Sequence, residues 1–300
     1  MIFPSGGSMN KPIFAGMTID EARKGLYHKL KQLYPSGEAG KMTDLVFENL
    51  TGYTPTVCIV KKNDLLSISQ EDKLDKMNLA LLQHAPLQYV LKEAWFCNMP
   101  FYVNEKVLIP RPETEELVDW VLKFVEETGM SNGILDAGTG SGCIAIALKK
   151  KIPSLSVYAF DKYQTALEVA KRNAVGLGTD VRFLQADLLE RDTWEVIPPV
   201  DILVSNPPYI PTKDREEMPE NVIEYEPGTA LFVPDHDPLV FYKKILELSG
   251  EKLPPGGAVF VEIYEGLGAE VKKLFEKKFK QVVLKKDLSG KDRMVSGIRQ

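Results

Sequence analysis

Residues 134–148, with the sequence ILDAGTGSGCIAIAL, constrain the fold more than any other part of this chain. They predict a short buried strand, a glycine-rich turn and an apolar helix, in that order. The turn consists of Gly138, Thr139, Gly140, Ser141 and Gly142. Its glycines are each two residues apart, which differs from the dinucleotide fingerprint G-x-G-x-x-G. Glycine permits positive φ and close approach of backbone N–H groups, and a helix N-terminus attracts negative charge, so we expect this turn to bind a ligand.

The rest of the C-terminal half alternates between strand-like and helix-like segments. The expected strands are 134–137, 157–161, 181–185, 201–205, 257–263, 280–285 and 294–298. The expected helices are 144–150, 164–174, 237–249 and 267–278. This alternation predicts an α/β fold with a doubly wound, seven-stranded, mostly parallel sheet. A short connection containing Ser289 and Gly290 joins the last two strands, so we expect the final strand to be antiparallel.

Acidic residues stand at the carboxyl ends of two of these strands. Asp161 lies 21 positions after Gly140, where an acid can accept hydrogen bonds from both hydroxyls of a ribose. Asp187 and Leu188 follow the next strand, where an acid and an apolar side chain can hold the amine and the ring of an adenine. Ligands bind outside the carboxyl ends of parallel strands, so these residues and the glycine turn predict one nucleoside site.

The sequence Ser-Asn-Pro-Pro-Tyr at residues 205–209 follows the apolar strand that begins at 201. The side chain of Asn206 and the carbonyl of Pro207 offer two acceptors in nearly one plane, and Tyr209 offers a ring face beside them. This arrangement suits a planar –NH2 group, either the exocyclic amine of a base or a side-chain amide. The alternative is a plain turn at the end of a strand, because Asn and Pro are common turn residues.

With these motifs the chain resembles the class I S-adenosylmethionine-dependent methyltransferases, and among them the amino-methyltransferases with an Asn-Pro-Pro-Tyr motif. Three further segments are similar to the release-factor glutamine methyltransferase family: PLQYV at 86–90, FYV at 101–103 and VLIPRPETEE at 107–116. The similarity runs from about residue 86 to the C-terminus. It departs from the family at AWFC, residues 94–97, where a glycine-containing form is expected, and at Leu188, where some members carry Trp.

The resemblance implies a Rossmann-like methyltransferase that uses S-adenosylmethionine on a glutamine of peptide chain release factors. The catalytic residues that it implies are Asn206, Pro207, Pro208 and Tyr209. The implied cofactor-binding residues are Gly138, Thr139, Gly140, Ser141, Gly142, Asp161, Asp187, Leu188 and Asn206. Those expected to close over the cofactor or contact the substrate are Arg111, Pro112, Glu113 and Phe101. An ion pair at a domain interface remains the alternative for Arg111 and Glu113, and a core position the alternative for Phe101.

The charge balance and the cysteine spacing of the chain indicate which partners and which location to expect. Lys and Arg total 37 against 42 Asp and Glu, whereas a chain that binds bulk nucleic acid is more often basic. A nucleic-acid amino-methyltransferase acting on a flipped base is the first alternative function, and a non-enzymatic binder is the second. Cys58, Cys97 and Cys143 form no C-x-x-C pair, which fits a reducing cytosol and no metal site. No apolar stretch has the length of a membrane span. We expect a cytoplasmic monomer without a nucleic-acid substrate.

Four regions are expected along the chain. Residues 1–17 read as a flexible leader and 18–85 as a helical bundle, which either recognises a protein partner or acts as a stabilising cap. Residues 86–112 read as a β-hairpin linker, and 113–300 as the methyltransferase domain. In the bundle, Thr18 begins the first helix, Thr43 is expected to cap the second, and residues 69–72 are expected to begin the third. The acidic run Glu224, Tyr225 and Glu226 reads as a solvated loop or as a contact for a partner protein.

Overall fold

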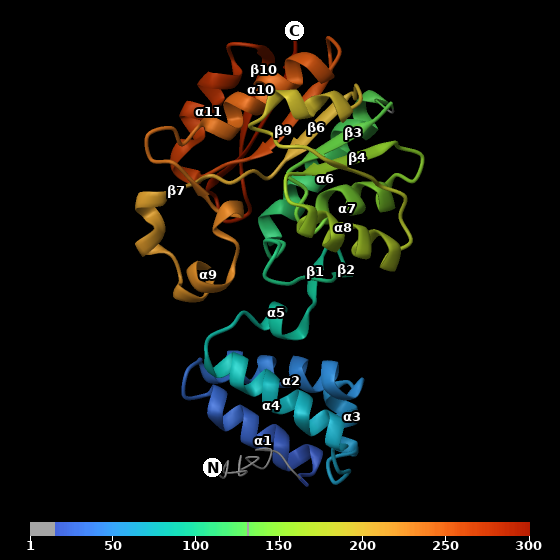
Figure 1. Cartoon of the computed structure of the whole chain (residues 1–300), viewed down its shortest axis with the longest axis vertical. Coiled ribbons are helices and arrows are strands. Elements are labelled where there is room, and N and C mark those ends of the chain that lie inside the picture. Colours follow the sequence, from blue (N-terminus) through green and yellow to red (C-terminus); the bar gives the residue numbers. More distant parts are fainter. Residues whose placement is uncertain (1–15, 131) are drawn as a thin grey trace, which may run out of the picture. The chain divides into compact units, whose positions relative to one another are not determined.

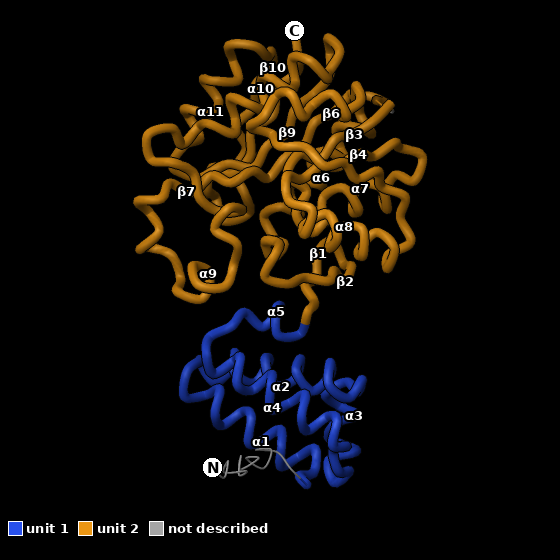
Figure 2. The backbone as a smooth tube through the Cα atoms, viewed as in Figure 1, with its two compact units in different colours: residues 1–91 blue, residues 92–300 orange. Residues whose placement is uncertain are grey.

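The computed structural model describes residues 16–130 and 132–300. The chain divides into two compact units, residues 1–91 and 92–300, which Figure 2 distinguishes by colour. Each unit has its own hydrophobic core. Most of the expected leader, residues 1–15, lies outside the described residues, but its last two residues are held in place. The carbonyl of Met17 accepts a hydrogen bond from Leu66 at 3.1 Å, so the folded chain begins before residue 18.

The first unit is helical. Its helices are α1 (Ile19–Leu30), α2 (Ser36–Thr51), α3 (Pro55–Val60), α4 (Ile68–Leu82) and α5 (Leu87–Leu91). Thr18 and Glu21 form the expected capping box at the start of α1. The buried face of α1 recurs at helical spacing in Ala22, Leu26 and Leu30, and these side chains pack in one cluster with residues of α2 and α4.

Two of the expected helix starts in this unit are wrong. Thr43 lies inside α2, and its hydroxyl donates to the carbonyl of Ala39 at 2.8 Å instead of capping a helix. The helix α4 begins at Ile68, because Ser67 and Gln70 form a capping box that starts two residues earlier than expected. The short helix α3 was not predicted, although Thr54 as cap and Pro55 at the first helical position are a recognised signature of a helix start.

The second unit is built on a seven-stranded sheet. Its strands are β3 (Ile134–Ala137), β4 (Val157–Asp161), β5 (Arg182–Gln185), β6 (Ile202–Ser205), β9 (Ala258–Glu262), β10 (Phe279–Lys286) and β11 (Asp292–Arg299). Their order is β10-β11-β9-β6-β3-β4-β5. The final strand β11 is antiparallel to both of its neighbours, and all other pairs are parallel. The predicted fold class and the antiparallel final strand are confirmed.

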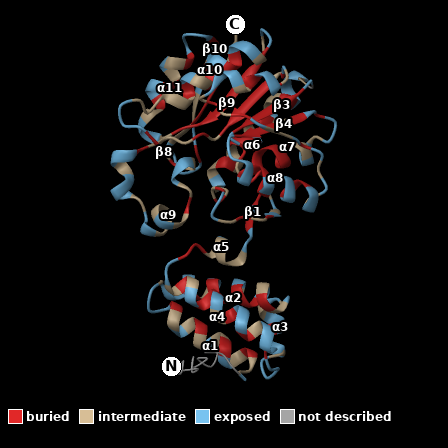
Figure 3. Cartoon of the chain, in the orientation of Figure 1, coloured by how far each residue is buried: buried red, intermediate tan, exposed pale blue. Residues whose placement is uncertain are grey.

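Helices cover both faces of this sheet. They are α6 (Pro112–Thr128), α7 (Cys143–Lys151), α8 (Gln164–Gly176), α10 (Val240–Lys252) and α11 (Gly268–Phe275). Figure 1 shows the strands between α10 and α11 on one side and α6, α7 and α8 on the other. The central strands β3, β6 and β9 are buried, as Figure 3 shows, whereas the edge strands β5 and β10 are partly exposed. Adjacent residues of β3 point to opposite faces, so Ile134 joins the core under α6 and α7 whereas Leu135 joins the core under α10. No helix within the described ranges is long and apolar enough to cross a bilayer.

The expected β-hairpin is shorter than its predicted range, 86–112. It comprises β1 (Ala94–Phe96) and β2 (Met99–Phe101), which pair antiparallel and belong to the second unit. Cys97 and Asn98 in the turn both have positive φ, as a two-residue hairpin turn of the primed type requires. Helix α5 precedes the hairpin, and α6 already begins at Pro112, because proline is favoured at the first position of a helix.

A long excursion leaves the sheet after β6 and returns at α10. It contains β7 (Ile210–Pro211), η2 (Thr212–Glu217), α9 (Glu220–Tyr225), η3 (Gly228–Ala230) and β8 (Phe232–Val233). Two further 3-10 turns are η1 (Arg191–Val196) and η4 (Glu265–Leu267). The strands β7 and β8 pair with each other and fold the excursion back. None of these short elements was predicted, because none is long enough to show a hydrophobic period.

Candidate active site

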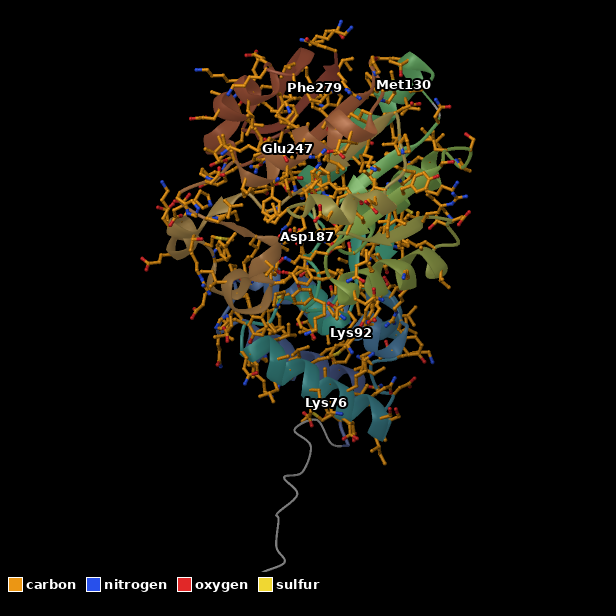
Figure 4. The ribbon with its side chains drawn as sticks, turned by 45° about the horizontal axis from the view of Figure 1, so that its top comes forward. Lys76, Lys92, Met130, Asp187, Glu247 and Phe279 are labelled. Atoms are coloured by element: carbon orange, nitrogen blue, oxygen red, sulfur yellow. The ribbon has the colours of Figure 1, made fainter. Side chains whose placement is uncertain are left out.

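A cavity of ≈ 380 Å³ opens at the carboxyl ends of β3, β4, β5 and β6. Gly138, Thr139, Gly140 and Ser141 of the glycine turn line it, as do Asp161, Asp187, Leu188 and Asn206, whereas Gly142 does not. The structure thus brings together the side chains that the sequence placed at separate strand ends. Asp187 is labelled in Figure 4. The lining also includes Arg111 and Thr114, from the segment before and within α6, and residues of the excursion between β6 and α10.

The glycine turn adopts a backbone that other residues would strain. Gly138, Gly140 and Gly142 have φ of 75°, 53° and 83°. A Cβ on Gly142 would also lie 3.0 Å from the side chain of Ile146 and 3.1 Å from that of Ala170. The third glycine therefore serves both the turn and the close packing of α7 on α8.

Asp161 connects the end of β4 to the glycine turn. One carboxylate oxygen accepts from the amide of Gly140 at 2.9 Å and the other accepts from the amide of Tyr163 at 2.9 Å. Burial raises the pKa of Asp161, and these two backbone hydrogen bonds act in the opposite direction. Because each carboxylate oxygen has further lone-pair capacity, the side chain can accept hydrogen bonds from two hydroxyls of a ligand while it holds the turn.

Asp187 is held by a partner that was not predicted. Its carboxylate lies 2.8 Å from the amine of Lys162 and accepts from the amide of Leu189 at 2.9 Å. The hydrogen bond to Asp187 raises the pKa of Lys162. Leu188, directly after Asp187, is buried against the core under α10 and lines the cavity with an apolar surface. The structure thus places an acid beside an apolar wall, and the assignment of this pair to an adenine stays a prediction.

A second acid, Asp136, lies beneath the glycine turn and is fully buried. It accepts from the hydroxyl of Thr139 at 2.6 Å and from the amide of Ala145 at 3.3 Å, whereas its Oδ1 has no partner among the described residues. Burial is the main reason that the pKa of Asp136 rises from 3.8 to about 7; the two hydrogen bonds lower it and the charge of Asp161 raises it.

This raised pKa predicts a stability that falls as the pH rises. Between pH 4 and 7 the folded protein binds a proton at Asp136 that the unfolded chain does not, so the free energy of unfolding should drop by about 1.4 kcal/mol per pH unit across this window. Asp136→Asn should remove that part of the slope, and Asp180→Asn, at an exposed position, should not. Urea denaturation followed by tryptophan fluorescence measures the second unit alone, because Trp95, Trp120 and Trp194 all lie there. Equal slopes for wild type and Asp136→Asn would contradict this prediction.

Asn206 lies at the edge of the cavity with its carboxamide fixed by neighbours. Its amide nitrogen donates to the hydroxyl of Thr114 at 3.1 Å. That hydroxyl donates to the carboxylate of Glu262 at 2.7 Å, and the same carboxylate accepts from the hydroxyl of Tyr209 at 3.0 Å. The amide nitrogen of Asn206 is thus engaged inside the protein, which leaves its oxygen as the group available to a ligand.

The other residues of the motif lie as follows. Pro207 and Pro208 line the cavity, whereas Tyr209 is not among its lining residues. The ring of Tyr209 stacks on Tyr264 with centroids 6.3 Å apart, and burial, followed by the charge of Glu262, raises the pKa of its hydroxyl. Tyr209 therefore contacts the protein on at least one side.

Of the four residues expected to close over the cofactor or contact the substrate, one lines the cavity. Arg111 lines it and pairs with Glu226 at 2.6 Å. Pro112 and Glu113 occupy the first turn of α6 and are not among the cavity-lining residues. Phe101 is fully buried and packs edge to face on Phe96 in the core, which is the alternative left open for it.

A solvated loop was one expectation for residues 224–226, and for Glu226 it is wrong. Its carboxylate side chain is 1% exposed. Besides pairing with Arg111, it accepts from the amide of Ile109 at 3.2 Å. It therefore ties the excursion after β6 to the segment before α6. Nothing in the local sequence distinguished Glu226 from its exposed neighbour Glu224.

Three contributors to the site were missed: Thr114, Lys162 and Glu262. Glu262 carried a usable signal, because it ends the apolar strand β9 as Asp161 ends β4. Thr114 lies within the arginine-proline segment, but nothing in the sequence pointed to its contact with residue 206. Across the described part of the chain no cluster of His, Cys, Asp and Glu could hold a metal ion.

Comparison with known proteins places this chain in a family. Residues 119–225 match the model of the methyltransferase small domain. A release factor glutamine methyltransferase of Flavobacterium psychrophilum is 45% identical over 247 residues, which cover 79% of this chain and 86% of the relative. One from Bacteroides thetaiotaomicron is 38% identical, covering 90% of this chain and 96% of the relative. This chain belongs to the release factor glutamine methyltransferase family.

Membership confirms the family resemblance and identifies the chain as a methyltransferase with a cofactor of the S-adenosylmethionine type. Among solved structures, the hMettl16 catalytic domain in complex with an RNA hairpin is similar with a TM-score of 0.53 and 14% identity, covering 79% of this chain and 84% of that one. A T. thermophilus 16S rRNA N2 methyltransferase bound to AdoMet and guanosine has a TM-score of 0.51 and 16% identity, covering 69% of this chain and 50% of that one. At such identities these two similarities show the fold alone.

Proposed function

We propose that this protein transfers a methyl group from S-adenosylmethionine to the side-chain amide nitrogen of a glutamine in peptide chain release factors. One observation carries the chemistry: the carboxamide of Asn206 lies at the edge of the nucleoside cavity with its nitrogen bound to Thr114, so its oxygen faces a ligand as an acceptor. The residues by themselves specify a planar amine as acceptor. The choice of glutamine rests on the family, whose members from F. psychrophilum and B. thetaiotaomicron bear that activity in their names.

The cavity fits the cofactor. In this proposal Asp161 accepts from the ribose hydroxyls, and Asp187 with Leu188 holds the adenine; the positions of these side chains in the cavity lining support both roles. The positive-φ backbone from Gly138 to Gly142 leaves room beside the sheet for the amino-acid part. When bound, the cofactor supplies an electrophilic methyl group on a sulfonium.

The protein then has to orient a weak nucleophile. The lone pair of an amide nitrogen is delocalised into its carbonyl, so the nitrogen reacts only as it turns pyramidal and gains positive charge. The oxygen of Asn206 and the carbonyl of Pro207 are acceptors that stabilise this charge as it develops, which raises the rate and not only the affinity. Holding the nitrogen in line contributes about 7–11 kcal/mol in well-oriented systems. No general base is needed early, because the proton can leave after the methyl group has been transferred.

The remaining residues of the motifs have supporting roles in this proposal. Pro208 stiffens the loop, and Tyr209 packs beside the substrate amide with its hydroxyl anchored on Glu262. Arg111, through Glu226, holds the excursion after β6 at the mouth of the cavity. Pro112 and Glu113 support this closure by starting α6, and Phe101 supports it from the core.

We also infer the role of each domain, the location of the protein and its oligomeric state. The helical unit, residues 18–85 in the sequence-based division, recognises the release factor, and residues 113–300 carry out methyl transfer. The three cysteines are free thiols, which supports a reducing cytoplasmic location. The protein acts as a monomer, and nucleic acid is not its substrate.

Methyl-labelled cofactor tests this proposal directly. The purified protein is incubated with a bacterial release factor, with the same factor in which the target glutamine is replaced by alanine, and with ribosomal RNA and DNA. We expect label on the unmodified release factor alone, located on a glutamine by mass spectrometry. Label on nucleic acid alone would support a base amino-methyltransferase, and no label on any acceptor would support a binder without activity.

A further inference from the structure

Behind the Asn-Pro-Pro-Tyr motif lies a chain of three hydrogen bonds that joins elements far apart in sequence. It runs from Asn206 to Thr114 at 3.1 Å, from Thr114 to Glu262 at 2.7 Å, and from Tyr209 back to Glu262 at 3.0 Å. Thr114 is 2% exposed and Glu262 is 1% exposed. Water is therefore excluded from the middle of this chain, and its members must satisfy one another.

The protons in this chain can be counted. A threonine hydroxyl has one proton and a carboxylate has none. Both oxygens of Glu262 act as acceptors, one from Thr114 and one from Tyr209, so the only proton of Thr114 is committed to Glu262. Thr114 can then only accept from Asn206. The carboxamide must turn its –NH2 group toward Thr114 and its oxygen toward the cavity.

With its carboxamide in the opposite orientation, Asn206 could not accept a hydrogen bond from the –NH2 group of the substrate. With the amide rotated by half a turn, its oxygen would face the lone pairs of Thr114 at about the same separation, and its –NH2 would face the –NH2 of the substrate. Restoring a hydrogen bond to Thr114 would require that hydroxyl to abandon Glu262 and leave one buried carboxylate oxygen without its donor. The two acceptor oxygens of Glu262 therefore determine which end of Asn206 the substrate meets.

We propose that Thr114 and Glu262 are positioning residues that fix the direction of the Asn206 carboxamide, so that it presents an acceptor to the amino group being methylated. The inference rests on the proposed function, because it assigns these residues to the recognition of a planar amine. Glu262 also holds Tyr209, so one buried carboxylate at the end of β9 orients both polar side chains of the motif. Neither Thr114 nor Glu262 needs to touch the reacting atoms.

The test compares Thr114→Val with Thr114→Ser. Valine keeps the shape of threonine but removes the hydroxyl, and serine keeps the hydroxyl but loses a methyl group. We expect Thr114→Val to lower kcat for release factor methylation about 10-fold, because one oriented hydrogen bond is lost. Its Kd for S-adenosylhomocysteine, measured by calorimetry, should stay within about 2-fold of wild type. Thr114→Ser should restore kcat to within about 3-fold of wild type.

A second variant guards against a folding defect in Thr114→Val. Glu262→Gln keeps the size of the side chain but carries an –NH2, which can donate to Thr114 and reverse the chain. We expect it too to lower kcat with cofactor affinity retained. Wild-type kcat in both Thr114→Val and Glu262→Gln would overturn the inference, as would a loss in Thr114→Ser equal to that in Thr114→Val.

The wild-type control separates this inference from the proposed function. If the wild-type protein methylates the release factor and the variants do so with the same kcat, the positioning role alone is wrong. If the wild-type protein methylates nucleic acid alone, the proposed substrate is wrong. The same variants are then compared on nucleic acid, because a base amine is also a planar –NH2. A selective fall of kcat on either acceptor supports the positioning role.

Discussion

Asn206→Ala is expected to lower kcat by about 100- to 1,000-fold, the range seen when one preorganised polar group is removed from a transition-state site. The side chain meets the substrate through its oxygen, and alanine has no acceptor to replace it. The affinity for S-adenosylhomocysteine should change by less than about 3-fold, because Asp161 and Asp187 bind the other end of the cofactor. Single-turnover kinetics and calorimetry measure the two quantities separately.

Asn132→Ala is the matched control for this experiment. Asn132 is exposed and interacts with Asp201 at the opposite end of the sheet from the motif, so its removal deletes the same carboxamide without reaching the cavity. It should leave kcat unchanged. An equal loss of turnover and of cofactor affinity in Asn206→Ala would mean that Asn206 mainly holds the cofactor.

Asp161→Ala is expected to raise the Kd for S-adenosylmethionine by at least about 100-fold. Hydrogen bonds to a charged group contribute about 1.5–3 kcal/mol each, and the variant loses the two expected to the ribose. It also releases the amides of Gly140 and Tyr163, so the glycine turn loses its anchor on β4. Equilibrium binding measured by calorimetry gives this Kd directly.

Asp180→Ala provides the comparison, since this carboxylate is exposed in the loop after α8 and is absent from the cavity lining. We expect wild-type affinity for that variant. If Asp161→Ala bound the cofactor as tightly as wild type does, the ribose would have to be held elsewhere, and the assignment of Asp161 would be wrong.

Much of the fold followed from local pattern. The strands β3 and β4 were predicted with the bounds that the structure shows, because each is a short apolar run that ends in a glycine turn or an acid. The acids that line the cavity were found in the same way, since the carboxyl ends of parallel strands converge on one edge of the sheet. By contrast, α9 and β7 have too few residues for a period to be visible.

The sequence by itself therefore determined the class of fold, the glycine turn and the positions of Asp161, Asp187 and Asn206, because these depend on neighbours within one strand–turn–helix unit. Only the tertiary structure decided what holds them. The partners of Asn206 and Thr114 lie 92 and 148 positions away, and those of Arg111 lie 115 away. Such contacts depend on where separate elements meet around the sheet. The sequence therefore does not distinguish a carboxylate that is buried in the folded protein, such as Glu262, from one that is exposed, such as Glu224.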